Sequence, residues 1–126
     1  MQDYHNLDIW QRGMTFAVDL YRLSAQWPEE ERYNLTGQLR RAAVSVPLNV
    51  AEGSGSATNP EFVRFLGYTY RSLKEIMTCL ELSLRLFPTL PSGPTRMLID
   101  EGDQIARMTS SLIDRLGPPD RRTDNG

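Results

Sequence analysis

The sequence predicts an all-α protein, an antiparallel up-down-up-down bundle of four helices. Apolar residues recur at helical spacing in four segments, proline- and glycine-rich stretches separate those segments, and none of them alternates like a strand. A chain of 126 residues buries about two thirds of its surface, which is enough for one hydrophobic core. We therefore expect one domain over residues 1–117 and a flexible tail over residues 118–126, where no apolar side chain anchors the chain.

Composition excludes several classes of function. The formal net charge of −2 argues against a strongly basic nucleic-acid binder but allows a local basic patch. The single cysteine, Cys79, excludes a disulfide framework, and the single histidine, His5, removes most hydrolase and metal chemistry. We expect no metal, no cofactor and no small-molecule substrate. Neither a signal peptide nor an apolar run of about 20 residues is visible, so we expect a cytoplasmic protein with no membrane partner.

The first predicted helix runs from about Leu7 to Trp27. Proline at position 28 ends it, because the residue before a proline avoids the helical conformation. Apolar residues at spacings of three and four place one stripe on a single face, which we expect to face the core. This stripe consists of Leu7, Trp10, Met14, Ala17 and Tyr21.

The second predicted helix starts near Glu29 and contains a proline. Its apolar stripe is Leu35, Leu39, Ala42, Val46 and Val50. Pro47 removes a backbone donor and opposes the carbonyl of Ala43, which predicts a kink in this helix. The hydroxyl of Ser45 is placed to hydrogen-bond a neighbouring carbonyl there. Gly53 is the expected C′ residue that ends the helix.

The third predicted helix carries the longest periodic pattern of the chain. It opens at Thr58 or Asn59, with Pro60 in its first turn, and ends at Phe87. Eight positions at a mean spacing near 3.5 predict coiled-coil packing. They are Phe62, Leu66, Thr69, Leu73, Ile76, Leu80, Leu84 and Phe87.

The fourth predicted helix runs from about Thr95 to Leu116, and Gly117 with the following proline ends it. Leu98, Ile105 and Leu112 lie seven residues apart on its core face. Gly102 weakens the middle of this helix but permits a neighbouring helix to approach closely.

Further apolar residues lie outside these stripes. Such residues indicate either a second apolar face that contacts other copies in a ring, or a wide core stripe. We favour contacts between copies. The residues are Ile9, Phe16, Val18, Phe65, Met77, Leu86 and Ile113.

One run in the second helix resembles the signature of a known family. The run from Gln38 to Gly53, QLRRAAVSVPLNVAEG, closely resembles that of the four-helix-bundle family of the 23S rRNA intervening-sequence protein. Segments 4–10, 27–35, 62–66 and 72–75 are also similar to that family. The resemblance implies a ring, typically a homopentamer. It also implies a link to accessory proteins of diversity-generating retroelements, which bind RNA and a reverse transcriptase. No enzymatic activity follows from the motif.

The polar residues of the signature admit two interpretations. Asn49 and Glu52 either bind a partner or hydrogen-bond backbone groups freed near the proline, and we favour the second. Arg41 pairs with either Glu52 or Glu75, and the sequence leaves this choice open. The full predicted structural motif is Arg41, Ser45, Pro47, Asn49, Glu52, Gly53 and Glu75.

Basic residues of the second and third helices are the candidates for RNA contact. They are Arg40, Arg41, Arg64, Arg71, Lys74 and Arg85. Tyr68 or Tyr70 is placed to stack on a base. The alternative is a set of exposed ion pairs at helical spacing, which taken alone explains the arginines better. Those pairs are Glu61–Arg64, Arg71–Glu75 and Glu81–Arg85.

Taken together, these features predict a non-enzymatic oligomeric scaffold that binds RNA or a ribonucleoprotein, with a reverse-transcriptase accessory protein as one form. The alternative function is a protein–protein adaptor with no affinity for nucleic acid.

Overall fold

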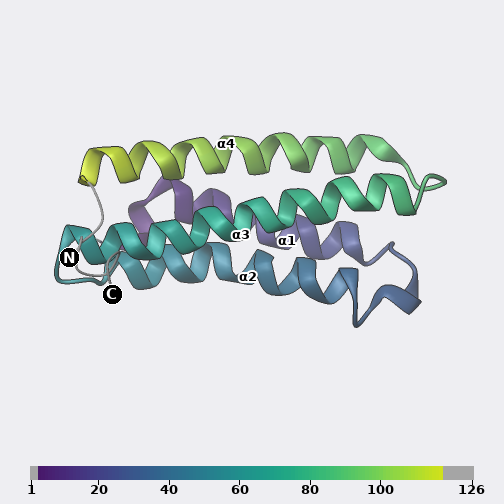
Figure 1. The fold of residues 1–126 in the computed structure, drawn as a ribbon, viewed down its shortest axis with the longest axis horizontal. Coiled ribbons are helices and arrows are strands. Elements are labelled where there is room, and N and C mark those ends of the chain that lie inside the picture. The colour runs from purple at the N-terminus through teal and green to yellow at the C-terminus, as the bar shows by residue number, and fades with distance from the viewer. Residues whose placement is uncertain (1–2, 118–126) are drawn as a thin grey trace, which may run out of the picture.

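Four long helices form the structure, a computed structural model that describes residues 3–117 (Figure 1). They are α1 (Asp8–Ser24), α2 (Leu35–Ser54), α3 (Asn59–Leu86) and α4 (Ser92–Leu116). Two short 3₁₀ turns, η1 (Tyr4–Asn6) and η2 (Glu29–Glu31), precede α1 and α2. The predicted tail over residues 118–126 lies outside the described residues.

The helices pack in chain order around a square. Helix α1 contacts α2 and α4, and α3 contacts the same two helices, so α1 and α3 are diagonal to each other. Short connections make successive helices antiparallel, and Figure 1 shows all four lying side by side along the long axis. The predicted up-down-up-down bundle is confirmed.

Local sequence signals explain some helix boundaries but not all. Helix α1 ends at Ser24 and not at Trp27, and α2 begins at Leu35 and not near Glu29, because the three glutamates form the separate turn η2. At the start of α3, Thr58 Oγ1 accepts a hydrogen bond from the Glu61 amide at 3.3 Å, and Pro60 occupies the first turn. Helix α2 runs without a break through Pro47 to Ser54, and its C-cap is Gly55. The prediction that Gly53 ends the helix was therefore wrong. The kink at Pro47 stays a prediction.

The core face of α1 differs from the predicted one. The prediction chose the stripe that includes Met14 and Tyr21, but these side chains are 42% and 41% exposed. The face that packs inward instead includes Phe16 and Leu20, which are almost completely buried. Both faces repeat at spacings of three and four, so periodicity alone could not distinguish them. The buried positions of α1 are Ile9, Gly13, Phe16, Leu20 and Ser24.

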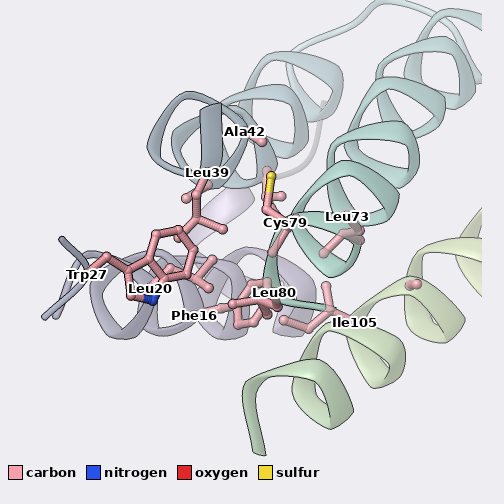
Figure 2. Close-up of a cluster of buried hydrophobic side chains, with 13 residues drawn as sticks. Phe16, Leu20, Trp27, Leu39, Ala42, Leu73, Cys79, Leu80 and Ile105 are labelled. Carbon is pink, nitrogen blue, oxygen red and sulfur yellow. The ribbon is translucent and has the colours of Figure 1, made fainter. Parts of the chain in front are cut away.

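The core fills the space between all four helices. Figure 2 shows Trp27 beside Leu20 and Leu39 at one end of the larger cluster. A second cluster, formed around Val50 and Leu66, continues toward the other end of the bundle. The apolar stripes predicted for α2 and α3 are buried almost throughout, with Leu35, Leu84 and Phe87 half-buried at the helix ends.

The middle of α4 approaches its neighbours closely at Gly102. A Cβ atom there would lie 3.1 Å from Phe16 Cζ and 3.3 Å from Met77 Cγ, closer than nearly all real Cβ contacts. The predicted role of Gly102 in close helix approach is confirmed. Within residues 3–117, no helix is both long enough and apolar enough to cross a membrane.

Candidate nucleic-acid interface

The polar residues of the α2 signature lie along its seam with α3. Ser45 Oγ donates to the Ala42 carbonyl at 2.8 Å and lies 2.5 Å from Ser72 Oγ. Asn49 Nδ2 donates to the Ser45 carbonyl at 2.8 Å. From α3, Thr69 Oγ1 donates to the Val46 carbonyl at 3.2 Å. None of these bonds reaches the carbonyl of Ala43, which loses its helical donor at Pro47. They add donors to other carbonyls of α2, and the bond from Thr69 joins α3 to α2.

Arg41 does not pair with either predicted partner. Within residues 3–117, no carboxylate lies within 4.0 Å of its guanidinium, so the predicted pairs with Glu52 and Glu75 are not formed. All three side chains are exposed. Its Nη1 instead lies over Gly37, where an added Cβ would approach it to 3.2 Å. An exposed charge gains little from a fixed partner in water, which explains why no such pair is needed.

Gly53 allows the end of α2 to touch the start of α3. A Cβ atom at this position would lie 2.8 Å from Phe62 Cδ1 and 2.9 Å from Phe65 Cβ. Glycine is therefore required for helix packing and not for the helix end. The backbone of α3 at Phe65 therefore lies close to the end of α2.

The guanidinium of Arg40 is held by contacts with the end of α1. Its Nε donates to Ser24 Oγ at 3.0 Å, and its Nη2 donates to the Tyr21 carbonyl at 3.1 Å. The guanidinium also lies 4.7 Å from the centre of the Tyr21 ring. A cation is favourable at the C-terminus of α1, where backbone carbonyls lack helical partners. Arg40 thus joins α1 to α2, and we remove it from the candidates for RNA contact.

The basic residues of α3 are all exposed on the outer surface of the bundle. The predicted pair of Arg64 with Glu61 is confirmed, at 3.8 Å. The predicted pairs of Arg71 and Arg85 with their neighbouring glutamates are not formed within 4.0 Å. Lys74 Nζ lies 5.1 Å from the centre of the Tyr70 ring. We call Arg64, Arg71, Lys74 and Arg85 the α3 basic strip.

A shallow apolar groove follows the outer seam of α1 and α2. Its volume is about 360 Å³. Three residues of the α1 stripe that was predicted to face the core, Trp10, Met14 and Ala17, line the groove instead. The two end residues of that stripe, Leu7 and Tyr21, do not line it. Sequence reasoning missed the opposite wall, where Val44 and Leu48 are exposed. The lining residues are Tyr4, Trp10, Met14, Ala17, Val18, Val44, Pro47, Leu48 and Ala51.

Metal-ligating side chains and the single cysteine are the remaining chemical features of the described residues. No three His, Cys, Asp or Glu side chains of residues 3–117 gather where they could hold a metal ion. Cys79 is buried among core side chains. Burial, and secondly the charge of Glu75, raise the pKa of its thiol, which disfavours the reactive thiolate.

Fold and surface together define a class of protein: a small up-down four-helix bundle with a polar signature on its second helix, an exposed apolar groove and a basic strip. The chain belongs to the 23S rRNA-intervening sequence protein family, whose model matches residues 5–111. The predicted family is confirmed.

A solved structure supports the fold. A protein of unknown function from the S23 ribosomal protein family of Bacteroides thetaiotaomicron superposes with a TM-score of 0.74 at 18% identity. The match covers 83% of this chain and 97% of the other. No curated protein matches the sequence.

Proposed function

We propose that this protein is a non-enzymatic, self-assembling cytoplasmic scaffold that binds RNA through the α3 basic strip. One observation carries the proposal. Arg71, Lys74 and Arg85 are exposed on the same helix as Arg64, and none of the first three has a carboxylate within 4.0 Å among the described residues. Cations that no local carboxylate neutralises are available to phosphates.

The geometry of the strip suits a polyanion. Arg64 and Arg85 are 21 residues apart on one continuous helix, which corresponds to about 31 Å at 1.5 Å per residue. Each neutralised phosphate releases counterions, so several spaced cations bind RNA more tightly at low salt. The net charge of −2 is compatible with this, because three of the acids lie together in η2, outside α3.

Self-assembly through the α1/α2 groove is the second part of the proposal. Met14, Val18, Val44 and Leu48 are each between 39% and 53% exposed, although they are apolar. Burying such a surface against another copy is favourable. A ring of copies, which we expect to be a homopentamer, would present one basic strip per copy. Repetition then raises the affinity for one long RNA through avidity.

Titration of a labelled RNA of mixed sequence, at several salt concentrations, tests RNA binding. The double variant Arg71→Glu/Arg85→Glu is compared with Arg96→Glu/Arg115→Glu, which makes the same charge change on exposed residues of α4. We expect the α3 variant to lower affinity by on the order of tenfold or more and to flatten the salt dependence, and the α4 variant to change affinity much less. No binding at low salt, or equal losses in both variants, would contradict the proposal.

The second candidate function is a protein–protein adaptor with no affinity for RNA. The α1/α2 groove favours it, because an apolar groove of this kind also suits a different protein. This candidate would replace the first if the chain stays monomeric and no RNA binds. RNA binding that depends on Arg71 and Arg85 would rule it out. If RNA binds, a ribonucleoprotein such as a reverse transcriptase with its RNA is a further partner to test.

A further inference from the structure

The outermost line of α3 carries an aromatic ring between two arginines. Arg64, Tyr68 and Arg71 are spaced by four and three residues, so they project from the same face of the helix. All three are exposed, whereas Leu66, Thr69 and Leu73 between and beside them are fully buried. The same surface therefore offers a ring and two cations at neighbouring positions.

The ring of Tyr68 is held in place from below. It meets the ring of Phe65 at 88°, with the two ring centres 5.8 Å apart. Beneath this pair, α3 lies close against α2, because a Cβ added at Gly53 would come within 2.9 Å of Phe65 Cβ. The Arg64 guanidinium lies 5.5 Å from the centre of the Phe65 ring. Tyr68 is thus an oriented ring with 39% of its surface exposed, and little side-chain entropy is lost when a ligand stacks on it.

The other tyrosines of this part of the molecule lack these features. Tyr70 is half-buried against the core, and Lys74 Nζ already lies 5.1 Å from its ring centre. Tyr33 is 84% exposed and lines a hollow with Lys74, but it precedes α2, and Arg32 already lies 5.6 Å from its ring centre. Of the two tyrosines that the sequence proposed for stacking, the geometry favours Tyr68.

From this arrangement we infer that the strip binds single-stranded RNA in preference to duplex, with one base stacked on Tyr68 and the flanking phosphates on Arg64 and Arg71. The phosphate on Arg64 replaces the 3.8 Å contact of this arginine with Glu61. The inference rests on the proposed function and specifies its ligand. In an A-form duplex the bases are stacked on each other, so their faces are closed to a protein ring, whereas unpaired bases are open to stacking. Base–aromatic stacking is tolerant of sequence, so we expect no strong preference among bases.

Binding of a labelled single-stranded RNA and of the matched duplex tests this inference. Replacing Tyr68→Leu keeps an apolar side chain but removes the ring. We expect single-strand affinity to fall by about fivefold or more, and duplex affinity to change by less than about twofold. The control Tyr21→Leu removes a tyrosine that is 41% exposed on α1, the helix diagonal to α3, and should leave both affinities unchanged.

Conservative variants separate stacking from hydrogen bonding. Tyr68→Phe and Tyr68→Trp both keep a ring, so we expect near wild-type affinity for the single strand. Circular dichroism of each variant verifies that the bundle is folded.

Equal losses of single-strand and duplex affinity in Tyr68→Leu, or no loss in either, would overturn the inference. If Arg71→Glu/Arg85→Glu still weakens binding in that case, the proposed function stands without the preference for single strands. If no RNA binds the wild-type protein at low salt, the proposed function fails as well.

Discussion

Gly53 lies where the last turn of α2 meets the first turn of α3. The sequence identified this glycine as a motif residue but assigned it to the helix end. Its actual role depends on Phe62 and Phe65 lying within 3 Å of a hypothetical Cβ, which is a tertiary contact that no local pattern reveals. Arg40 is a similar case, because its partners at the end of α1 become neighbours only after the helices pack.

Replacing Gly53→Ala should destabilise the bundle. The new methyl group would overlap Phe62 and Phe65, and forced repacking costs about 1–3 kcal/mol in the free energy of unfolding. The matched control is Gly67→Ala on α3, where nothing lies within 4 Å of the added Cβ. There we expect stabilisation by up to about 1 kcal/mol, because alanine is the better helix former. Urea denaturation measures both, and a Gly53→Ala protein as stable as wild type would contradict this packing.

The thiol of Cys79 should be unreactive in the folded protein. The residue is 4% exposed, so a reagent has little access to the sulfur. Burial also raises the pKa of the thiol, so less of it is in the reactive thiolate form. We expect labelling by a thiol reagent at pH 8 to be on the order of a hundredfold slower than in urea. The folded state holds the thiol proton more tightly than the unfolded state does. The free energy of unfolding therefore decreases as the pH rises from the thiol pKa of the unfolded chain to the higher thiol pKa of the folded protein. Rapid labelling of the native protein would contradict the buried position.

At the scale of the helices, α3 and α1 show what periodicity can and cannot predict. The eight-position pattern of α3 identifies its buried face because it continues along the whole helix, although Leu82 and Leu86 are exposed outside it. Helix α1 has two apolar faces of equal period. The core takes the face with Phe16 and Leu20, and the face with Met14 and Val18 is left outside. Of the three α1 residues that were predicted to lie outside the core stripe, Ile9 and Phe16 are buried and Val18 is exposed.

A charged pair that the sequence did not reveal adds to the apolar contact between α1 and α4. Arg12 Nε donates to Glu101 Oε2 at 3.0 Å, Arg12 Nη2 donates to Glu101 Oε1, and the same Nη2 also donates to Gln104 Oε1 at 2.9 Å. The hydrogen bonds to Glu101 raise the pKa of Arg12, as expected for a guanidinium held by a carboxylate. The two residues are 89 positions apart, beyond the reach of helical spacing rules.

A double-mutant cycle tests this bridge between α1 and α4. Both side chains are about one third exposed, so we expect Glu101→Gln to cost only about 1 kcal/mol in the free energy of unfolding. In the Arg12→Met background the same change should cost clearly less, because its partner is already absent. Strictly additive effects in urea denaturation would contradict a direct interaction.

For the whole molecule, the exposed apolar groove and the basic strip lie on different helices. The proposed assembly through α1 and α2 would therefore leave the outer face of α3 open to the proposed RNA, and mutations should separate the two. Sequence patterns predicted the bundle and the family, since these follow from periodicity and from one signature. They could not predict the groove, because its α2 wall is built from Val44 and Leu48, which only the packed structure leaves exposed.

Leu48→Lys should weaken self-assembly without unfolding the subunit. Leu48 is 53% exposed and lines the groove, so a lysine there is solvated in the monomer but unfavourable in a closed apolar contact. Leu86→Lys is the control, since Leu86 is 55% exposed and lies outside the groove. Light scattering after size exclusion should show smaller species for Leu48→Lys only. Unchanged assembly of this variant would place the contact elsewhere.

Native mass spectrometry of the full chain, mixed with a short single-stranded RNA at low salt, tests the proposed scaffold most directly. The proposal predicts a closed oligomer, with five copies as the expected number, carrying bound RNA. Single chains at working concentration, with no RNA attached, would contradict it.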